Sequence, residues 1–174
     1  MSRPTSSSAA LPIAHVVLRI LIVGNWLWAV AILALFVAPH EQWLMRSFEL
    51  SPSPDTDRLI MGMRVIMALG LVVIPLNYLI LKRLLAIVET VRAGDPFVAA
   101  NAARLQAIAW ALLALQLLGL VIDAIAKSIS TPAHPVNLDA GVSVNGWLAV
   151  LLTFLLARVF AQGTHMRDDL EGTV

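Results

Sequence analysis

The sequence predicts an all-α integral membrane protein with four transmembrane helices. Of its 174 residues, 59% are hydrophobic and 13% are charged, and the mean hydropathy is +0.84. A soluble core of this size cannot bury so much apolar surface, so lipid is the expected solvent. A helix needs roughly 20 apolar residues to cross a bilayer. Four runs reach that length, at 14–37, 59–81, 105–126 and 144–161.

The first run, 14–37, is expected to remain in the mature protein as a helix. It is longer than the apolar core of a secretory signal, contains Asn25 and two tryptophans, and is followed by Pro39, which makes a poor cleavage site. Residues 1–13 before it are rich in Ser and Pro and contain too little apolar surface to fold alone. We expect a disordered cytoplasmic leader there.

The second run, 59–81, is expected to continue as a helix into the cytoplasm. Apolar residues recur at helical spacing as far as Val91. A helix over 59–93 would be about 52 Å long, against a hydrocarbon core of about 30 Å. Gly94 suits the C-terminal cap of this helix, and Pro96 prevents its continuation. The chain is therefore predicted to turn directly after Gly94.

The third and fourth helices follow the same pattern. Asn101 is predicted to be the N-cap of the third helix, which crosses the membrane over 105–126. The fourth run, 144–161, leads to a short acidic cytoplasmic tail, 167–174. No segment outside the runs is long enough to form a soluble domain. Residues 14–166 are therefore expected to form one four-helix bundle in the membrane.

Basic residues in the short loops predict the orientation. Around the two termini and the segment between the second and third runs, the basic residues are Arg3, Lys82, Arg83, Arg92, Arg104, Arg158 and Arg167. The opposite side has Arg46, Arg58 and Lys127, diluted by four acidic residues. Because cytoplasmic loops carry an excess of Lys and Arg, both termini are predicted to be cytoplasmic.

Charged side chains inside the spans form two candidate pairs. Arg64 and Asp123 lie at similar shallow depth near the outer side, so they could pair with each other or snorkel to the interface separately. On the inner side, Arg19 and Arg158 match in depth, with Asn77 near that level. These two arginines could hold an anion or a polar headgroup together, or each could snorkel to lipid phosphates.

The residues do not predict an enzyme. The four histidines are scattered without an i, i+4 pair or a His-carboxylate cluster, so no metal site is expected. The sequence contains no phosphate-binding glycine loop and no recognisable nucleophile with its base, and no cofactor is expected. No basic stripe with interleaved aromatics indicates direct nucleic-acid binding. The bilayer is the only partner that composition itself predicts.

Two separated segments carry a resemblance to a known family. They are RAGDPFVAANAARLQAIAW at 92–110 and ARVFAQGTHMRDDLEGTV at 157–174. In this order they resemble the bacterial four-helix membrane family called domain of unknown function 2975, over nearly the whole chain. The sharpest matches are Gly94, Asp95, Pro96, Phe97, Asn101, Arg104, Leu105, the run 167–170, Thr173 and Val174. The resemblance implies a multi-pass protein of the bacterial inner membrane.

The resemblance also implies a regulatory function. Members of this family lack an assigned enzymatic activity and are often encoded beside a small helix-turn-helix regulator of the Cro/C1 type. The chain is therefore expected to be a non-enzymatic membrane sensor or anchor for such a regulator. The candidate docking residues on the cytoplasmic face are Arg92, Asp95, Pro96, Phe97, Asn101, Arg104, Arg167, Asp168 and Asp169.

Other functions remain compatible with the same residues. A small transporter or channel subunit would need a polar path and a homo-oligomer, since four spans rarely enclose a path alone. Here the polar residues lie toward the ends of the spans, which argues against a continuous path. A membrane assembly factor is the third possibility. The segment between the second and third runs could also be a plain amphipathic hairpin, and the tail a solvated end without a partner.

Overall fold

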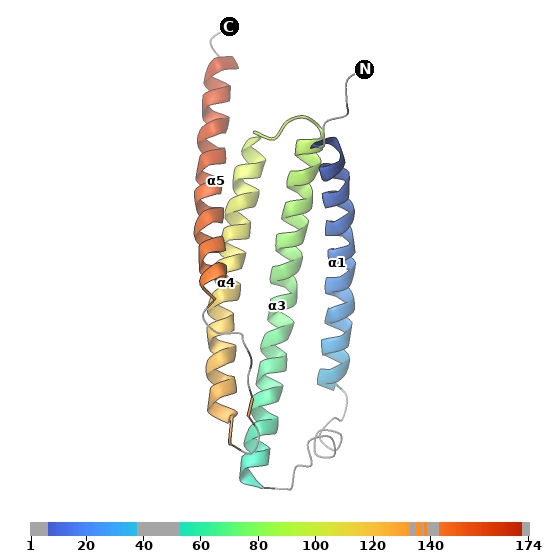
Figure 1. Cartoon of the computed structure of the whole chain (residues 1–174), viewed down its shortest axis with the longest axis vertical. Coiled ribbons are helices and arrows are strands. Elements are labelled where there is room, and N and C mark those ends of the chain that lie inside the picture. The colour runs from blue at the N-terminus through green and yellow to red at the C-terminus, as the bar shows by residue number, and fades with distance from the viewer. Residues whose placement is uncertain (1–6, 38–52, 133–134, 137, 139–142, 172–174) are drawn as a thin grey trace.

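The structure is a computed structural model that describes residues 7–37, 53–132, 135, 136, 138 and 143–171, without the side chains of 7–9, 165 and 167–171. This part of the chain forms four helices, α1 (Ser7–Val37), α3 (Pro54–Arg92), α4 (Ala99–Ile129) and α5 (Val144–Glu171). They run alternately up and down (Figure 1). Each is long and apolar enough to cross a membrane. The prediction of an all-α protein with four candidate spans is confirmed.

Helix α1 begins earlier than its apolar run. Residues 7–13, predicted to belong to a disordered leader, form its first turns, and Pro12 lies inside the helix. Residues 1–6 lie outside the described residues. The composition of the leader argues against folding alone, but an existing helix extends without a second nucleation step. The expectation of a leader disordered up to residue 13 is corrected to this extent.

Helix α3 is the longest element, with 39 residues, or about 58 Å. It begins at Pro54 because Ser53 caps it: the Ser53 hydroxyl accepts a hydrogen bond from the Thr56 backbone N–H at 3.2 Å. Asp55 and Asp57 in the first turn face the positive end of the helix dipole. The helix continues through Pro75 to Arg92. How far it extends beyond the membrane into the cytoplasm stays a prediction.

Helices α4 and α5 also extend beyond their apolar runs. Helix α4 begins at Ala99, and its N-cap is Val98, which makes no side-chain capping bond. The prediction that Asn101 caps this helix is therefore wrong. Helix α5 runs to Glu171, ten residues past the predicted end of the span at residue 161. The polar residues that follow the apolar run continue the helix, since they include no proline.

The helices pack in a row that follows the order of the chain. The extensive contacts join α1 to α3, α3 to α4, and α4 to α5. Within the described residues, no comparable contact joins α1 to α5, and these two helices form the edges of the row (Figure 1). The expected bundle is therefore not closed. Lipid can solvate the remaining apolar faces, so nothing forces the first and last helices together.

The core lies where α3 and α4 pack together. Its most buried members include Leu59, Leu105, Ile108, Ala109 and Ile129. In contrast, no side chain of α1 that the structure describes is fully buried. The middle pair of helices is therefore the best packed part of the molecule, and α1 is held mainly along one side.

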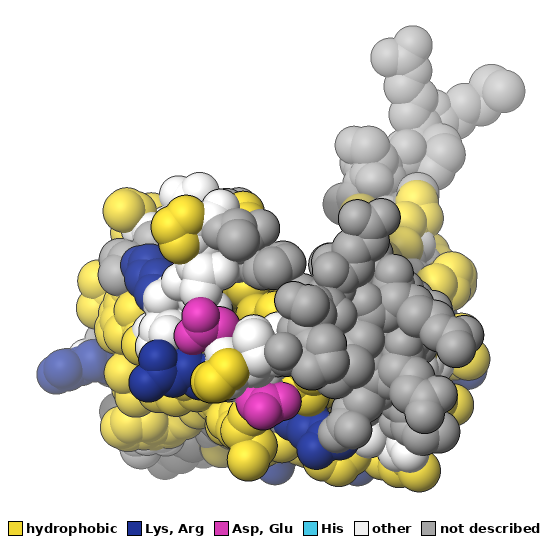
Figure 2. Space-filling view, turned by 90° about the horizontal axis from the view of Figure 1, so that it is seen from below, with side chains coloured by type: hydrophobic (Ala, Val, Ile, Leu, Met, Phe, Trp, Pro, Cys, Tyr) yellow, Lys and Arg dark blue, Asp and Glu magenta, His cyan; other side chains and the backbone are white. Residues whose placement is uncertain are grey.

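The helices run side by side, and the two ends of the molecule along the helix axes carry different residues. The start of α1, the end of α5 and the turn between α3 and α4 all lie at one end, and α5 continues past the turn (Figure 1). Figure 2 shows the opposite end, where acidic and basic side chains lie among apolar ones. The predicted orientation, with both termini cytoplasmic, would place the turn in the cytoplasm.

Candidate functional site

The turn between α3 and α4 begins with a Schellman motif. Gly94 has a φ of 88°, the left-handed conformation that glycine adopts without strain. The Asp95 N–H donates to the Thr90 carbonyl at 3.1 Å, and the Gly94 N–H donates to the Val91 carbonyl at 3.1 Å. These bonds satisfy carbonyls that the end of a helix leaves unpaired. Gly94 therefore terminates α3 as the sequence predicted.

Asn101 is the central side chain of the turn. It is fully buried, with 0% of its surface exposed, in the first turn of α4. Its amide nitrogen donates to the Thr90 hydroxyl at 2.7 Å and to the Pro96 carbonyl at 2.8 Å. Its amide oxygen accepts from Arg104 Nη1 at 2.8 Å. One side chain thus joins the last turns of α3, the connecting segment and the first turns of α4.

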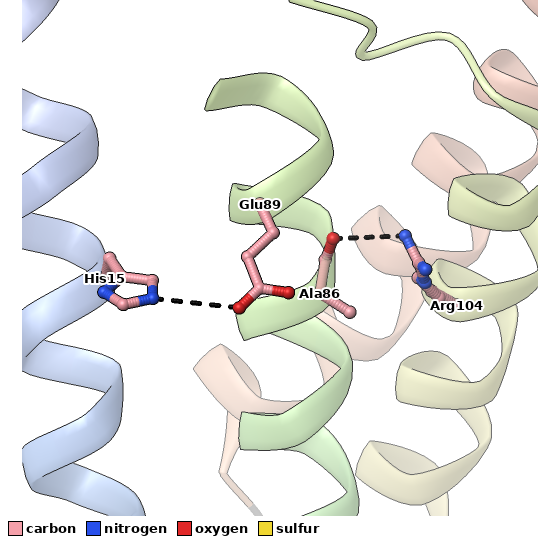
Figure 3. Close-up of polar contacts among 4 residues, drawn as sticks. All are labelled: His15, Ala86, Glu89 and Arg104. Atoms are coloured by element: carbon pink, nitrogen blue, oxygen red, sulfur yellow. Dashed lines mark hydrogen bonds and ion pairs between the residues drawn. The ribbon is translucent and has the colours of Figure 1, made fainter. Parts of the chain in front are cut away.

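Arg104 extends this network across the helix pair. Its Nη1 also donates to the Ala86 carbonyl on α3, at 3.1 Å (Figure 3). The Thr90 hydroxyl donates to the Ile87 carbonyl one turn earlier, so its oxygen remains available to accept from Asn101. A buried polar group is stable only when its hydrogen bonds are made, and this network makes them. The turn is consequently a fixed structure.

Helix α1 reaches the same end of α3 from the other side. His15 Nε2 lies 3.7 Å from Glu89 Oε1, and in Figure 3 this contact and the Arg104 contact lie on opposite sides of α3. Farther from the turn along α1 and α3, Asn25 donates to the Ile74 carbonyl at 3.3 Å, and the rings of Trp26 and Tyr78 pack edge to face. Polar contacts thus bind α3 to both neighbours near the turn.

Phe97 connects the turn to α5. Its ring centroid is 5.3 Å from that of Phe160, and α5 passes close to the Phe97 ring at Gly163. Nevertheless, Phe97 remains 45% exposed. The two segments that carry the family resemblance, far apart in the sequence, therefore meet at one end of the molecule.

The other predicted docking residues surround this contact to different degrees. Arg92 is exposed in the last turn of α3, and Asp95 is half-buried in the turn. Arg167, Asp168 and Asp169 belong to the last turns of α5, but their side chains lie outside the described residues. The turn residues and Phe97 are placed together, while the position of the tail carboxylates stays a prediction.

A comparison with protein families identifies the family of the chain. The model of a family described as "Protein of unknown function (DUF2975)" matches residues 7–174. The chain belongs to the DUF2975 family. No curated protein and no solved structure matches it. The family membership confirms the resemblance, while the neighbouring regulator stays an expectation.

The charged residues within the spans of the DUF2975 chain, which were candidates for pairing, lie on all four helices. Asp123 forms an ion pair with Lys127 on its own helix, with Nζ and Oδ2 2.6 Å apart. For Arg64, pairing and snorkelling both remain open. Arg19 and Arg158 are exposed on α1 and α5, the two edges of the row, so the structure does not bring them to a shared anion. Asn77 is half-buried on α3.

Sequence analysis missed three partners in the DUF2975 site. The Thr90 hydroxyl and the Ala86 carbonyl accept hydrogen bonds in the network, and the ring of Phe160 packs against that of Phe97. A threonine in an apolar helix is too common to signal this role, and a backbone carbonyl gives no sequence signal at all. Phe160 lies in the segment that carries the resemblance, so that segment was the one available signal. In the described part of the chain, no three His, Asp or Glu side chains gather where they could hold a metal ion.

Proposed function

We propose that the DUF2975 chain is a non-enzymatic membrane anchor or sensor that docks a cytoplasmic partner on the surface formed by the α3–α4 turn and α5. We call this surface, made of Arg92, Asp95, Phe97 and residues 160–171, the turn face. The partner suggested by the family resemblance is a small helix-turn-helix regulator of the Cro/C1 type.

The observation that carries this proposal is the exposed Phe97 on a rigid turn. A hairpin that only joins two spans needs neither a buried hydrogen-bond network nor an exposed aromatic ring. Here the Asn101 network fixes the backbone around Phe97, while nearly half of the ring stays accessible. Pre-organised aromatic side chains are typical anchors of protein interfaces, because little entropy is lost on binding.

The charge of the tail supports a basic partner. Asp168, Asp169 and Glu171 outnumber Arg167 in the last turns of α5. A regulator that binds DNA presents a basic face, and acidic side chains can compete for such a face. A regulator held at the bilayer would be depleted from the chromosome, and a shift of the helices would release it.

A transporter or channel is less compatible with the row of helices. A row one helix thick encloses no path for a solute, so several copies would have to surround one. Membrane assembly factor is the remaining alternative, and it differs from the regulatory proposal only in the identity of the partner. The experiment must therefore identify the protein that binds.

A co-purification experiment tests the proposal. The chain and the regulator encoded beside it are co-expressed, the membranes are solubilised in detergent, and the recovered regulator is quantified. For Phe97→Ala we expect recovery to fall by about tenfold, the equivalent of roughly 1.4 kcal/mol, because an interface anchor is truncated. Deletion from Arg167 onward should also reduce recovery.

Phe154→Ala is the matched control for Phe97→Ala. Phe154 packs against Trp110 with ring centroids 5.2 Å apart, so this variant also removes an aromatic contact between α4 and α5, but away from the turn. It should leave recovery of the regulator unchanged. If the wild-type chain recovers no regulator, the regulator is not the partner of this chain. If both alanine variants lose recovery alike, the turn face is not the docking surface.

A further inference from the structure

A second candidate site lies between α3 and α4, next to the turn but distinct from the turn face. It is a cavity of about 480 Å³ on the side of the helix pair. Its lining includes Pro75, Tyr78, Lys82, Arg83, Ala86 and Arg104. Three of these side chains are cations. An open cavity with this lining favours an anionic ligand.

Within the described residues, no carboxylate forms an ion pair with the cations of this cavity, Lys82, Arg83 and Arg104. Glu89, the carboxylate on the same part of α3, contacts His15 on the opposite side of that helix (Figure 3). An external anion would therefore meet three positive charges that are not paired with a carboxylate of the described residues.

Two of the cations are held in place for such a role. Arg104 uses only Nη1 for its bonds to Ala86 and Asn101, so its Nε and Nη2 groups can donate to another acceptor. Lys82 Nζ lies 5.8 Å from the centroid of the Tyr78 ring, within the range of a cation–π contact. A snorkelling side chain needs no such fixed partners, which distinguishes these residues from isolated interfacial arginines.

The level of the cavity in the membrane matches that of lipid phosphates. Lys82 and Arg83 directly follow the apolar run of α3, and Arg104 directly precedes that of α4. The 23 residues of the α3 run extend about 34 Å, close to the thickness of the hydrocarbon core of about 30 Å. The three cations therefore lie at the edge of the hydrocarbon, where headgroups begin.

An apolar cavity adjoins the cationic one, nearer the middle of the spans. It measures about 420 Å³, lies between α1 and α3, and shares Pro75 and Tyr78 with the first cavity. Its other lining residues include Trp26, Val30, Leu33 and Ile74. A cationic cavity that adjoins an apolar one reproduces the division of a phospholipid into an anionic headgroup and an acyl chain. A free phosphate would use only the first.

We infer that the two cavities bind one anionic phospholipid, with its phosphate among Lys82, Arg83 and Arg104 and an acyl chain against Trp26 and Ile74. Basic pockets between transmembrane helices are suited to such headgroups. The bound phosphate would contact Arg104, which also holds Asn101, so the lipid would act on the network that fixes the turn. The inference does not depend on any docking partner.

Native mass spectrometry of the purified full chain in detergent tests this inference. The protein is titrated with phosphatidylglycerol and with zwitterionic phosphatidylcholine of the same acyl chains. Wild type should bind phosphatidylglycerol more tightly. The variant Lys82→Gln with Arg83→Gln should bind it about 25-fold more weakly, because each cation near an anionic lipid contributes about fivefold. Both side chains are exposed, so folding should be retained.

Arg19→Gln with Arg158→Gln is the matched control. Like the test variant, it removes two positive charges, but from exposed positions outside the cavity. It should leave the affinity for phosphatidylglycerol unchanged. Ala29→Trp, which fills the apolar cavity and leaves the cations in place, should weaken the binding of phosphatidylglycerol. Equal loss in both double variants, or equal wild-type affinity for the two lipids, would overturn the site. Competition by inorganic phosphate at lipid concentrations would overturn the choice of a lipid.

Discussion

At the scale of single residues, Asn101 illustrates what a residue type reveals and what it hides. Asparagine before a helical run predicts an N-cap, because its side chain can accept from unpaired backbone N–H groups. In the structure the N-cap of α4 is Val98, three residues before Asn101. The Asn101 side chain instead forms hydrogen bonds with Thr90, Pro96 and Arg104. Both roles use the same polar atoms near a helix start. Only the position of α3 decides between them, and the sequence does not specify that position.

Asn101→Ala should destabilise the protein by about 2 to 4 kcal/mol, because the half-buried Pro96 carbonyl and Arg104 both lose a partner. The free energy of unfolding can be measured by denaturant titration in mixed micelles. Gln106→Ala, at an exposed position of the same helix, should change it by less than about 0.5 kcal/mol. Similar values for both variants would show that the network contributes little to stability.

At the scale of helices, apolar runs located the spans but not the ends of the elements. Every predicted span lies within an observed helix, and every helix is longer than its span. Hydropathy reports where lipid surrounds the chain, whereas a helix ends where its backbone hydrogen bonds end. For α3 a local signal did exist, since Ser53 followed by Pro54 and Asp55 is a typical helix start. For α5 no proline or cap marked the predicted end.

Helices α3 and α4 approach each other closely at Gly62, near the start of α3. A methyl group added there would lie 2.5 Å from Ile129 Cγ2, too close for unchanged packing. Gly62→Ala should therefore cost about 1 to 3 kcal/mol of unfolding free energy. Adding Ile129→Ala should recover part of this loss, and a double-mutant cycle in the same micelle assay measures the coupling.

Gly24→Ala provides the control for Gly62→Ala. A methyl group at Gly24 on α1 meets no atom within 4 Å. This variant should be neutral or stabilise by up to about 1 kcal/mol, because alanine favours the helix. Destabilisation of the same size in both glycine variants would mean that the close approach of α3 and α4 is not its cause.

At the scale of the whole molecule, the arrangement of helices could not be predicted from the sequence. Soluble helices show an apolar stripe that identifies their neighbours, whereas these helices are apolar on nearly all sides. The row therefore emerged only from the structure. The meeting of Phe97 with Phe160 follows from it, because α4 and α5 are neighbours in the row.

Cysteine cross-linking tests the order of the helices. The chain contains no cysteine, so introduced pairs react without background. Trp26→Cys with Tyr78→Cys, and Trp110→Cys with Phe154→Cys, should cross-link within one monomer with a short bifunctional thiol reagent. Arg19→Cys with Arg158→Cys should not, since the edges of the row are apart. An efficient monomeric product from this last pair, detected by mass spectrometry, would indicate a closed bundle.

The open row of helices affects how α3 can tilt in the bilayer. The apolar run of α3, about 34 Å long, slightly exceeds the hydrocarbon core, so we expect α3 to tilt slightly in a bilayer of ordinary thickness and to stand more upright in a thicker one. Because α3 packs along both α1 and α4, its tilt is imposed on them as well. A closed bundle would resist such a change from all sides. An open row lacks contacts that would oppose this change, so we expect the tilt of α3 to depend on bilayer thickness.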